Sequence, residues 1–165
     1  MIRPAVPEDG PQVFELARQF ATSFTVEEAA FKRSWDALLK TENATVIVCG
    51  EEGVIEGYLL GFCHRSFYAN GPVAWVEELL VAETRRGQGI GTMLMEDFET
   101  WAQTKKCRLV ATATRRAAAF YQGLGYEESA SYFRKLLEEA EPAGEDRKAQ
   151  RAAKRERRNR DEPKS

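Results

Sequence analysis

A basic, glycine-rich segment is the part of this sequence best suited to binding a ligand. Glycine stands at every second position of residues 86–92, at Gly87, Gly89 and Gly91, after an apolar stretch and before an amphipathic one. The pattern predicts a turn into a helix N-terminus, where unpaired amides bind an anion and glycine lets the backbone approach it closely. The guanidinium of Arg86 would add charge toward a phosphate. The spacing fits neither the Walker sequence nor GxGxxG, so the usual nucleotide-binding motifs are excluded.

Two adjacent carboxylates, Glu77 and Glu78, interrupt the apolar run 73–81 just before this turn. Because successive residues of a strand face opposite sides of a sheet, one of them must point toward whatever covers the sheet. A carboxylate in that place is costly unless it is paired or takes part in chemistry. Each glutamate could be a catalytic base, an ion-paired carboxylate or a solvated one. The sequence also leaves open which of the two faces inward.

The composition indicates one folded domain followed by a charged tail. The 165 residues are 43% hydrophobic and 30% charged, with a net charge of −2, which is enough apolar material for one core. Residues 1–137 hold 15 basic and 18 acidic groups. Residues 138–165 hold 9 and 8, without any aromatic residue, Leu, Ile, Val or Met. We therefore expect a domain over 1–137 and a disordered tail over 138–165.

The few cysteine and histidine residues exclude several kinds of site. Cys49, Cys63 and Cys107 form no CxxC pair, so neither a zinc site nor a disulfide scaffold is predicted, and they are interpreted as small apolar core residues. The single histidine, His64, is interpreted as structural, with a catalytic base as the alternative. No apolar run resembles a signal peptide or reaches the roughly 18 residues of a membrane span, so a cytoplasmic protein without membrane contact is expected.

Hydrophobic periodicity and turn residues predict the elements that position these side chains. Strands are expected at 2–6, 44–49, 54–63, 73–81, 107–113 and 132–137. Helices are expected after Pro7–Asp9, after a capping box at Thr25–Glu28, after the glycine turn and at 115–122. This order predicts an α/β sandwich with a sheet of mixed direction.

Two segments match motifs that occur together in one known family. Residues 86–91 read Arg-Gly-Gln-Gly-Ile-Gly, matching R/Q-x-x-G-x-G/A, and residues 117–126 match A-x-x-F-Y-x-x-L-G-F/Y at the expected distance downstream. With the same order of strands and helices, residues 1–137 resemble the GNAT superfamily of acetyl-CoA-dependent N-acetyltransferases. The resemblance implies a mixed, mainly antiparallel central sheet flanked by helices, with strands 4 and 5 splayed apart beside a bulge.

The resemblance also implies acetyl-CoA as cosubstrate, and the cysteine and histidine residues predict no metal. In the family, Tyr121 would be the general acid that protonates the CoA thiolate, and Glu77 the base that accepts the amine proton directly or through water. Thr114 stands where many relatives have an asparagine that contacts pantetheine. The implied cofactor-binding residues are those of the turn, the adjacent strand and this threonine: Leu79, Leu80, Val81, Arg86, Gly87, Gln88, Gly89, Ile90, Gly91, Thr92 and Thr114.

The acceptor is expected to be a cationic amine such as an aminoglycoside, a polyamine or a peptide amine. Glutamates gather in the segments that would build the acceptor side of such a fold: Glu27, Glu28, Glu51, Glu52, Glu56, Glu77 and Glu78. The alternative function is a non-catalytic acyl-CoA-binding regulatory module, against which the presence of Tyr121 and Glu77 argues. A monomer and a homodimer both stay open.

The basic stretch 147–160 carries eight basic residues and one acidic residue, Glu156. Contact with nucleic acid is one interpretation of this charge. Because no aromatic residue is interleaved for base stacking, a solvated appendage is the favoured one.

Overall fold

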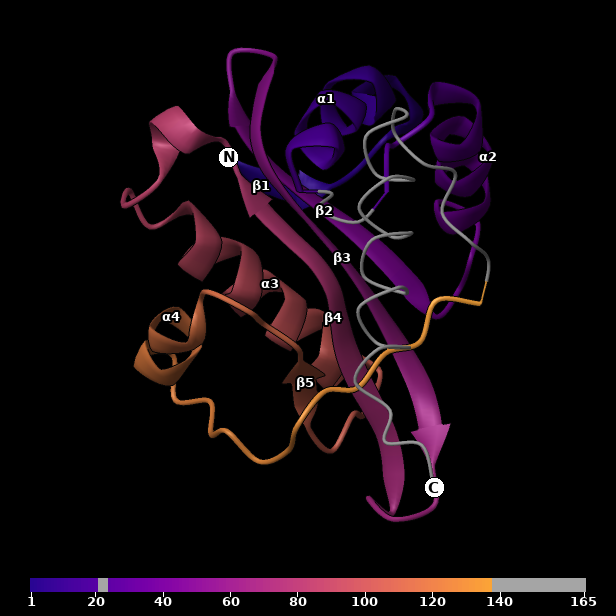
Figure 1. Cartoon of the computed structure of the whole chain (residues 1–165), viewed down its shortest axis with the longest axis vertical. Helices are drawn as coiled ribbons and strands as arrows, with labels where there is room; N and C mark the ends of the chain where they lie inside the picture. Colours follow the sequence, from indigo (N-terminus) through magenta and orange to yellow (C-terminus); the bar gives the residue numbers. More distant parts are fainter. Residues whose placement is uncertain (21–23, 138–165) are drawn as a thin grey trace, which may run out of the picture. The chain divides into compact units, whose positions relative to one another are not determined.

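The computed structural model describes residues 1–20 and 24–137 (Figure 1). The chain divides into a first unit, Met1–Ala21 with Val26–Tyr132, and a second, Thr22–Thr25 with Phe133–Ser165. The first unit contains the helices and strands, in the order β1 (Ile2–Pro4), η1 (Pro7–Asp9), α1 (Gly10–Phe20), α2 (Glu28–Leu38), β2 (Ala44–Glu51), β3 (Val54–Ser66), β4 (Gly71–Val81), η2 (Glu83–Arg85), α3 (Ile90–Thr104), β5 (Val110–Thr112) and α4 (Ala118–Gly123).

The sheet has five strands in the order β1-β2-β3-β4-β5. Neighbouring strands are antiparallel except for β4 and β5, which are parallel. Glu52 and Gly53 connect β2 to β3 with positive φ angles of 52° and 81°, the backbone that a two-residue hairpin turn requires. The predicted hairpin and the predicted mixed, mainly antiparallel sheet are confirmed.

Helices cover both faces of this sheet, with α1 and α2 on one side and α3 on the other (Figure 1). Each face has its own apolar core. The core under α1 and α2 is built around Val13, Leu16, Trp35, Val48 and Tyr58. The core under α3 is built around Ile47, Leu59, Val76, Leu94, Met95 and Phe98. Alternation along the strands supplies both cores, because successive side chains point to opposite faces.

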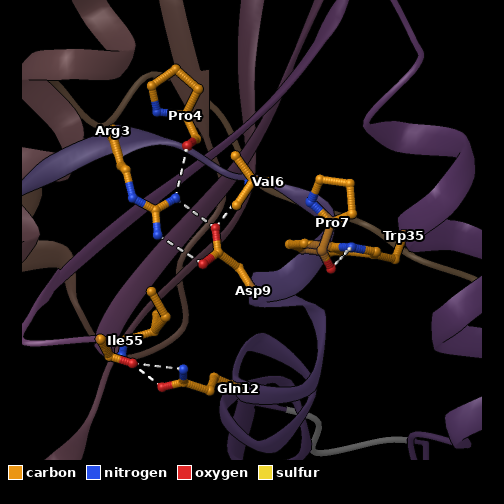
Figure 2. A network of polar contacts seen from close by, with 9 residues as sticks. Arg3, Pro4, Val6, Pro7, Asp9, Gln12, Trp35 and Ile55 are labelled. Atoms are coloured by element: carbon orange, nitrogen blue, oxygen red, sulfur yellow. Dashed lines mark hydrogen bonds and ion pairs between the residues drawn. The ribbon is translucent and has the colours of Figure 1, made fainter.

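A buried carboxylate ties the start of α1 to the edge of the sheet (Figure 2). Asp9 is 5% exposed and accepts hydrogen bonds from Arg3 at 2.6 and 2.8 Å and from the amide of Val6 at 2.8 Å. The hydrogen bonds from Arg3 hold the pKa of this carboxyl below its usual range. One turn further on, Gln12 accepts a hydrogen bond from the amide of Ile55 at 2.8 Å, so α1 is held against the hairpin of β2 and β3.

Two expectations are wrong. The second helix begins at Glu28 with Glu27 as its N-cap and no side-chain cap bond, so the box expected at Thr25–Glu28 does not form. The amide of Phe31 donates to the carbonyl of Glu27 at 2.9 Å, which places the first helical turn two residues later than expected. The segment 132–137 is not a strand. Its aromatic and apolar residues are insufficient, since a strand forms only where its backbone finds a partner.

The other elements occur where they were expected, with shorter bounds for β1, β5 and α4. Within the described ranges, no helix is long and apolar enough to cross a membrane. The predicted tail over 138–165, with its basic stretch, lies outside the described residues.

Candidate active site

The strands β4 and β5 part in the middle of β4. Only Ala74, Trp75 and Val76 of β4 pair with β5, opposite Val110–Thr112, although β4 continues beside β3 as far as Val81. Among the described residues, no strand pairs with residues 77–81 of β4 on the side away from β3. We call residues 77–81 the open edge. An extended ligand can pair with such an edge as an added strand would. The predicted splay of strands 4 and 5 is confirmed.

The open edge begins at a β-bulge. Leu60 of β3 pairs with Glu78 and its neighbour Gly61 pairs with Val76, so Glu77 is an extra residue without a partner. Bulges of this kind bend a strand and re-aim its side chains. The bulge predicted for this strand is therefore present, and it lies at the residue expected to act as the base.

The bulge also decides where the two carboxylates point. Val76 packs in the core under α3, and strict alternation would place Glu78 on that same face. The extra residue reverses the alternation, because Leu79 packs against the α3 core instead. Glu78 turns to the other face, where its carboxylate accepts a hydrogen bond from the hydroxyl of Tyr58 at 2.7 Å. Glu77 is exposed and accepts a hydrogen bond from Nε1 of Trp75 at 2.9 Å.

The surroundings of Glu78 differ from those of its neighbour. Burial raises the pKa of Glu78, the charge of Glu77 adds to the rise, and the hydrogen bond from Tyr58 opposes it. Burial, and then the charge of Glu78, raises the pKa of Tyr58 in turn. This phenol therefore stays protonated and donates a hydrogen bond to the carboxylate. Glu78 is thus engaged in the core, and Glu77 is the carboxylate accessible from solvent.

Tyr121 lies beside the point where the strands part. It is 9% exposed, belongs to the core under α3 and makes edge contacts with the rings of Phe120 and Tyr126 at 5.0 and 5.8 Å between centroids. Burial raises its pKa, and the adjacent Thr112 lowers it. The hydroxyl of Thr112 donates a hydrogen bond to the carbonyl of Val76 at 3.2 Å. Val76 is the residue before the bulge, so Thr112 connects Tyr121 to the start of the open edge.

The glycine turn lies at the far end of the open edge. Gly87 and Gly89 have φ angles of 75° and 81°, and a Cβ added at either would meet no atom within 4 Å. Gly89 is the N-cap of α3, and no side chain in the described part of the chain caps this helix. Nε of Arg86 donates to the carbonyl of Val81 at 3.2 Å, which fixes this exposed guanidinium beside the turn. The predicted turn into a helix N-terminus is therefore formed, and the first amides of α3 have no carbonyl partner within the helix itself.

Two of the expected ligand residues have structural contacts of their own. A Cβ at Gly91 would lie 3.2 Å from the ring of Phe120, so this glycine lets α3 pack closely against α4. The hydroxyl oxygen of Thr114 accepts a hydrogen bond from the amide of Ala117 at 3.0 Å and so shapes the entry to α4. Thr114 is nevertheless exposed and can still donate its hydroxyl hydrogen to a ligand.

The structure adds residues that the sequence did not single out. Trp75 holds the Glu77 carboxylate, and Thr112 links β4 to the surroundings of Tyr121. Trp75 could have been found from its spacing, because residues two apart on a strand share a face. His64, the alternative base, is exposed on β3. Among the described residues, no cluster of histidine, cysteine and carboxylate side chains is arranged to hold a metal ion.

Comparison with known proteins identifies a family for this chain and structures that share its fold. The family model described as acetyltransferase (GNAT) family matches residues 11–126. A search of curated proteins finds no match. Several solved structures share the fold.

A transcriptional regulator from Bacillus halodurans C-125 superimposes with a TM-score of 0.75 at 23% identity, over 83% of this chain and 99% of that one. Glucosamine-6-phosphate N-acetyltransferase from Arabidopsis thaliana has a TM-score of 0.74 at 21% identity, over 84% and 98% of the two chains. AAC(6')-Iy, solved in complex with the bisubstrate analogue CoA-S-monomethyl-acetylneamine, has a TM-score of 0.71 at 20% identity, over 83% and 98%. At these identities the likeness concerns the fold.

Proposed function

This chain belongs to the acetyltransferase (GNAT) family, and we propose that it transfers the acetyl group of acetyl-CoA to a primary amine. The observation that carries the proposal is the open edge of β4, which has Glu77 and Tyr121 at one end and the glycine turn at the other. Candidate groups for binding the donor, accepting a proton and donating a proton therefore all lie next to the open edge.

The donor is proposed to lie along the open edge. The free amides from Gly87 to Thr92 and the guanidinium of Arg86 suit the pyrophosphate of coenzyme A, since they combine a helix N-terminus with a fixed cation. The amides of the pantetheine arm would pair with the backbone of residues 79–81, as a peptide strand does. The thioester would then lie near the bulge.

The chemistry requires proton removal from the acceptor nitrogen and proton donation to the CoA sulfur. Glu77 takes a proton from the ammonium group, directly or through water, so that the neutral nitrogen attacks the thioester carbonyl. A C–N bond forms, the C–S bond breaks, and Tyr121 gives its proton to the departing thiolate. The second proton lost by the attacking nitrogen, directly or through water, restores the phenol of Tyr121. Burial suits Tyr121 to this task, because the raised pKa keeps the phenol protonated until the thiolate forms. Glu77 suits the first step because it is exposed.

The acceptor is proposed to be a cationic amine such as an aminoglycoside, a polyamine or a peptide amine. Among the ion pairs of the described residues, Glu56 is neutralised by Arg85 at 2.8 Å, whereas neither Glu77 nor Glu78 has a cationic partner. An ammonium group beside the bulge would supply the missing charge. A screen of amines that finds turnover only with neutral or anionic acceptors would contradict this.

A matched pair of glycine variants tests the donor site. Gly89 and Gly53 both have a φ of 81° and open space where a Cβ would lie, so Gly89→Ala and Gly53→Ala carry the same backbone strain of about 1–2 kcal/mol. Calorimetric titration with acetyl-CoA should show affinity about tenfold or more weaker in Gly89→Ala, because the methyl group enters the anion site. Gly53→Ala, in the β2–β3 turn, should bind as the wild type does. Equal losses in both variants would reject the turn as the donor site.

A second experiment tests the reaction itself. Release of the CoA thiol is measured for the wild type and Tyr121→Phe over aminoglycosides, polyamines and peptides. We expect turnover on an amine that falls by about 10²–10⁴-fold in Tyr121→Phe, the usual effect of losing a general acid. Acetyl-CoA binding without turnover on any amine would favour the regulatory module, and absence of binding would reject the proposed donor.

A further inference from the structure

Two cysteine sulfurs lie in contact on the α3 face of the sheet. Sγ of Cys63, on β3, is 3.3 Å from Sγ of Cys107, in the connection between α3 and β5, and both thiols are free. The two residues are 44 positions apart in the chain, so only the tertiary fold brings them together. A disulfide needs a sulfur separation of about 2.05 Å, which small rotations of two side chains in contact can supply.

Backbone hydrogen bonds hold both cysteines in place. Cys63 pairs with Ala74 of β4, and its own amide donates to the carbonyl of Asn43 at 2.8 Å. The amide of Cys107 donates to the carbonyl of Ala102 at 2.9 Å, at the end of α3. The next residue, Arg108, donates its amide to Pro72 at the start of β4, at 2.8 Å. The sulfur contact is therefore a product of the sheet and of the turn that leads into β5.

The two residues are also less buried than the third cysteine. Cys63 and Cys107 are partly exposed, whereas Cys49 is 3% exposed in the core. A small oxidant can therefore reach the pair in the folded protein. Packing alone does not require two neighbouring thiols at a partly exposed position, since any small apolar residue would fill the space.

We propose that Cys63 and Cys107 form an oxidisable dithiol, which a peroxide converts into an intramolecular disulfide. The sulfur of Cys63 attacks one oxygen of hydrogen peroxide and the O–O bond breaks. The thiol proton of Cys63 passes to the departing hydroxide, so a sulfenic acid and one water result. The sulfur of Cys107 then attacks the sulfenic sulfur, the S–O bond breaks and a second water leaves. Two thiols are oxidised by two electrons to one disulfide, and one peroxide is reduced to two waters.

The hydrogen bond between the sulfurs sets the order of attack. The thiol of Cys107 donates a hydrogen bond to the sulfur of Cys63, so the Cys107 proton is engaged in this contact and the Cys63 sulfur is its acceptor. Burial, followed by the influence of Cys63, raises the pKa of Cys107 to about 12. Cys63 is accordingly the attacking residue and Cys107 the resolving one.

The bond would brace the part of the fold that carries the open edge. It would join β3 to the connection into β5 and close a loop of 44 positions that contains β4, the glycine turn and α3. Cross-links that close loops of this length stabilise mainly by restricting the unfolded chain. The oxidised protein should unfold about 5–15 °C higher than the reduced protein.

The test treats the folded full-length chain with hydrogen peroxide, blocks the remaining thiols by alkylation and maps the peptides by mass spectrometry. We expect a linked pair of peptides containing Cys63 and Cys107, two hydrogens lighter than their sum, that a dithiol reductant separates. Cys49 should be alkylated only after denaturation. Over-oxidation of either sulfur without a link, or a link that includes Cys49, would overturn the proposal.

Two variants serve as controls for the thermal shift. Cys107→Ser should lose both the linked peptide and the rise in unfolding temperature on peroxide treatment. Cys49→Ser keeps the pair and should retain both. The peptide mapping is done on the wild-type protein, so the proposal can be tested even if one of the variants folds poorly. A linked wild type without any rise in unfolding temperature would overturn the inference that the bond braces the native fold.

Discussion

Replacing Glu77 by glutamine separates the proposed chemistry from the stability of the bulge. Glu77 is exposed, and the hydrogen bond that it accepts from Trp75 at 2.9 Å can equally be accepted by an amide oxygen. The free energy of unfolding should therefore change by no more than about 0.5 kcal/mol. An amide cannot take a proton from the ammonium group, so the contribution of a general base, about 10²–10⁴-fold in rate, should be lost. At 1.36 kcal/mol per factor of ten, this is about 2.7–5.4 kcal/mol of transition-state stabilisation.

The adjacent carboxylate is the matched control. Glu78→Gln keeps an oxygen that can accept from the hydroxyl of Tyr58 at 2.7 Å, but the hydrogen bond loses its charge. Hydrogen bonds to charged groups contribute about 1.5–3 kcal/mol and neutral ones about 1 kcal/mol, so this variant should lose about 1–2 kcal/mol of stability. Because Glu78 faces the core under α1 and α2, its kcat/KM should fall by less than about tenfold.

The assay combines thiol release at saturating acetyl-CoA with thermal unfolding of each variant. The expected pattern is a large loss of kcat at unchanged stability for Glu77→Gln, and the reverse for Glu78→Gln. A hundredfold loss in a folded Glu78→Gln protein, with Glu77→Gln near wild type, would refute the assignment made from the bulge. Wild-type rates in both variants would show that no carboxylate of β4 acts as the base.

Two further predictions concern stability. Asp9→Asn should cost about 2–3 kcal/mol in urea unfolding at pH 7, because the hydrogen bonds from Arg3 lose their charge on a carboxylate that is 5% exposed. The lowered pKa of Asp9 means that this stabilisation is complete above the unfolded value of about 3.9 and is lost as the pH falls through the folded value. The gap between wild type and Asp9→Asn should thus close in acid, and a gap independent of pH would contradict the charge argument. Gly61→Ala should destabilise by about 1–3 kcal/mol, because its Cβ would lie 2.2 Å from the buried ring of Phe98. Gly123→Ala, in open space at the end of α4, should unfold at an equal or higher temperature, and similar losses in both glycine variants would count against the steric explanation.

Features that depend on neighbours in the chain could be predicted from the sequence. The hairpin turn at Glu52 and Gly53, the periodic face of α3 and the glycine turn before it all follow from short-range patterns. The motif around Tyr121 lies on a helix, as expected, although α4 begins three residues later than predicted. The local residue types proved insufficient at 132–137, because aromatic and apolar side chains do not by themselves supply a hydrogen-bonding partner for the backbone.

Features that depend on register and on distant contacts were decided by the tertiary structure. Strict alternation along β4 would place Glu78 on the α3 face of the sheet. The bulge against Leu60 and Gly61 turns it to the opposite face, beside Tyr58. The contact between Cys63 and Cys107 likewise joins segments 44 positions apart. The sequence by itself determined the order of the elements as far as α4 and the glycine turn before α3, because turn and helix preferences act over a few residues. Only the folded sheet decided which carboxylate is exposed to solvent and which thiols meet, because strand register depends on packing between distant segments.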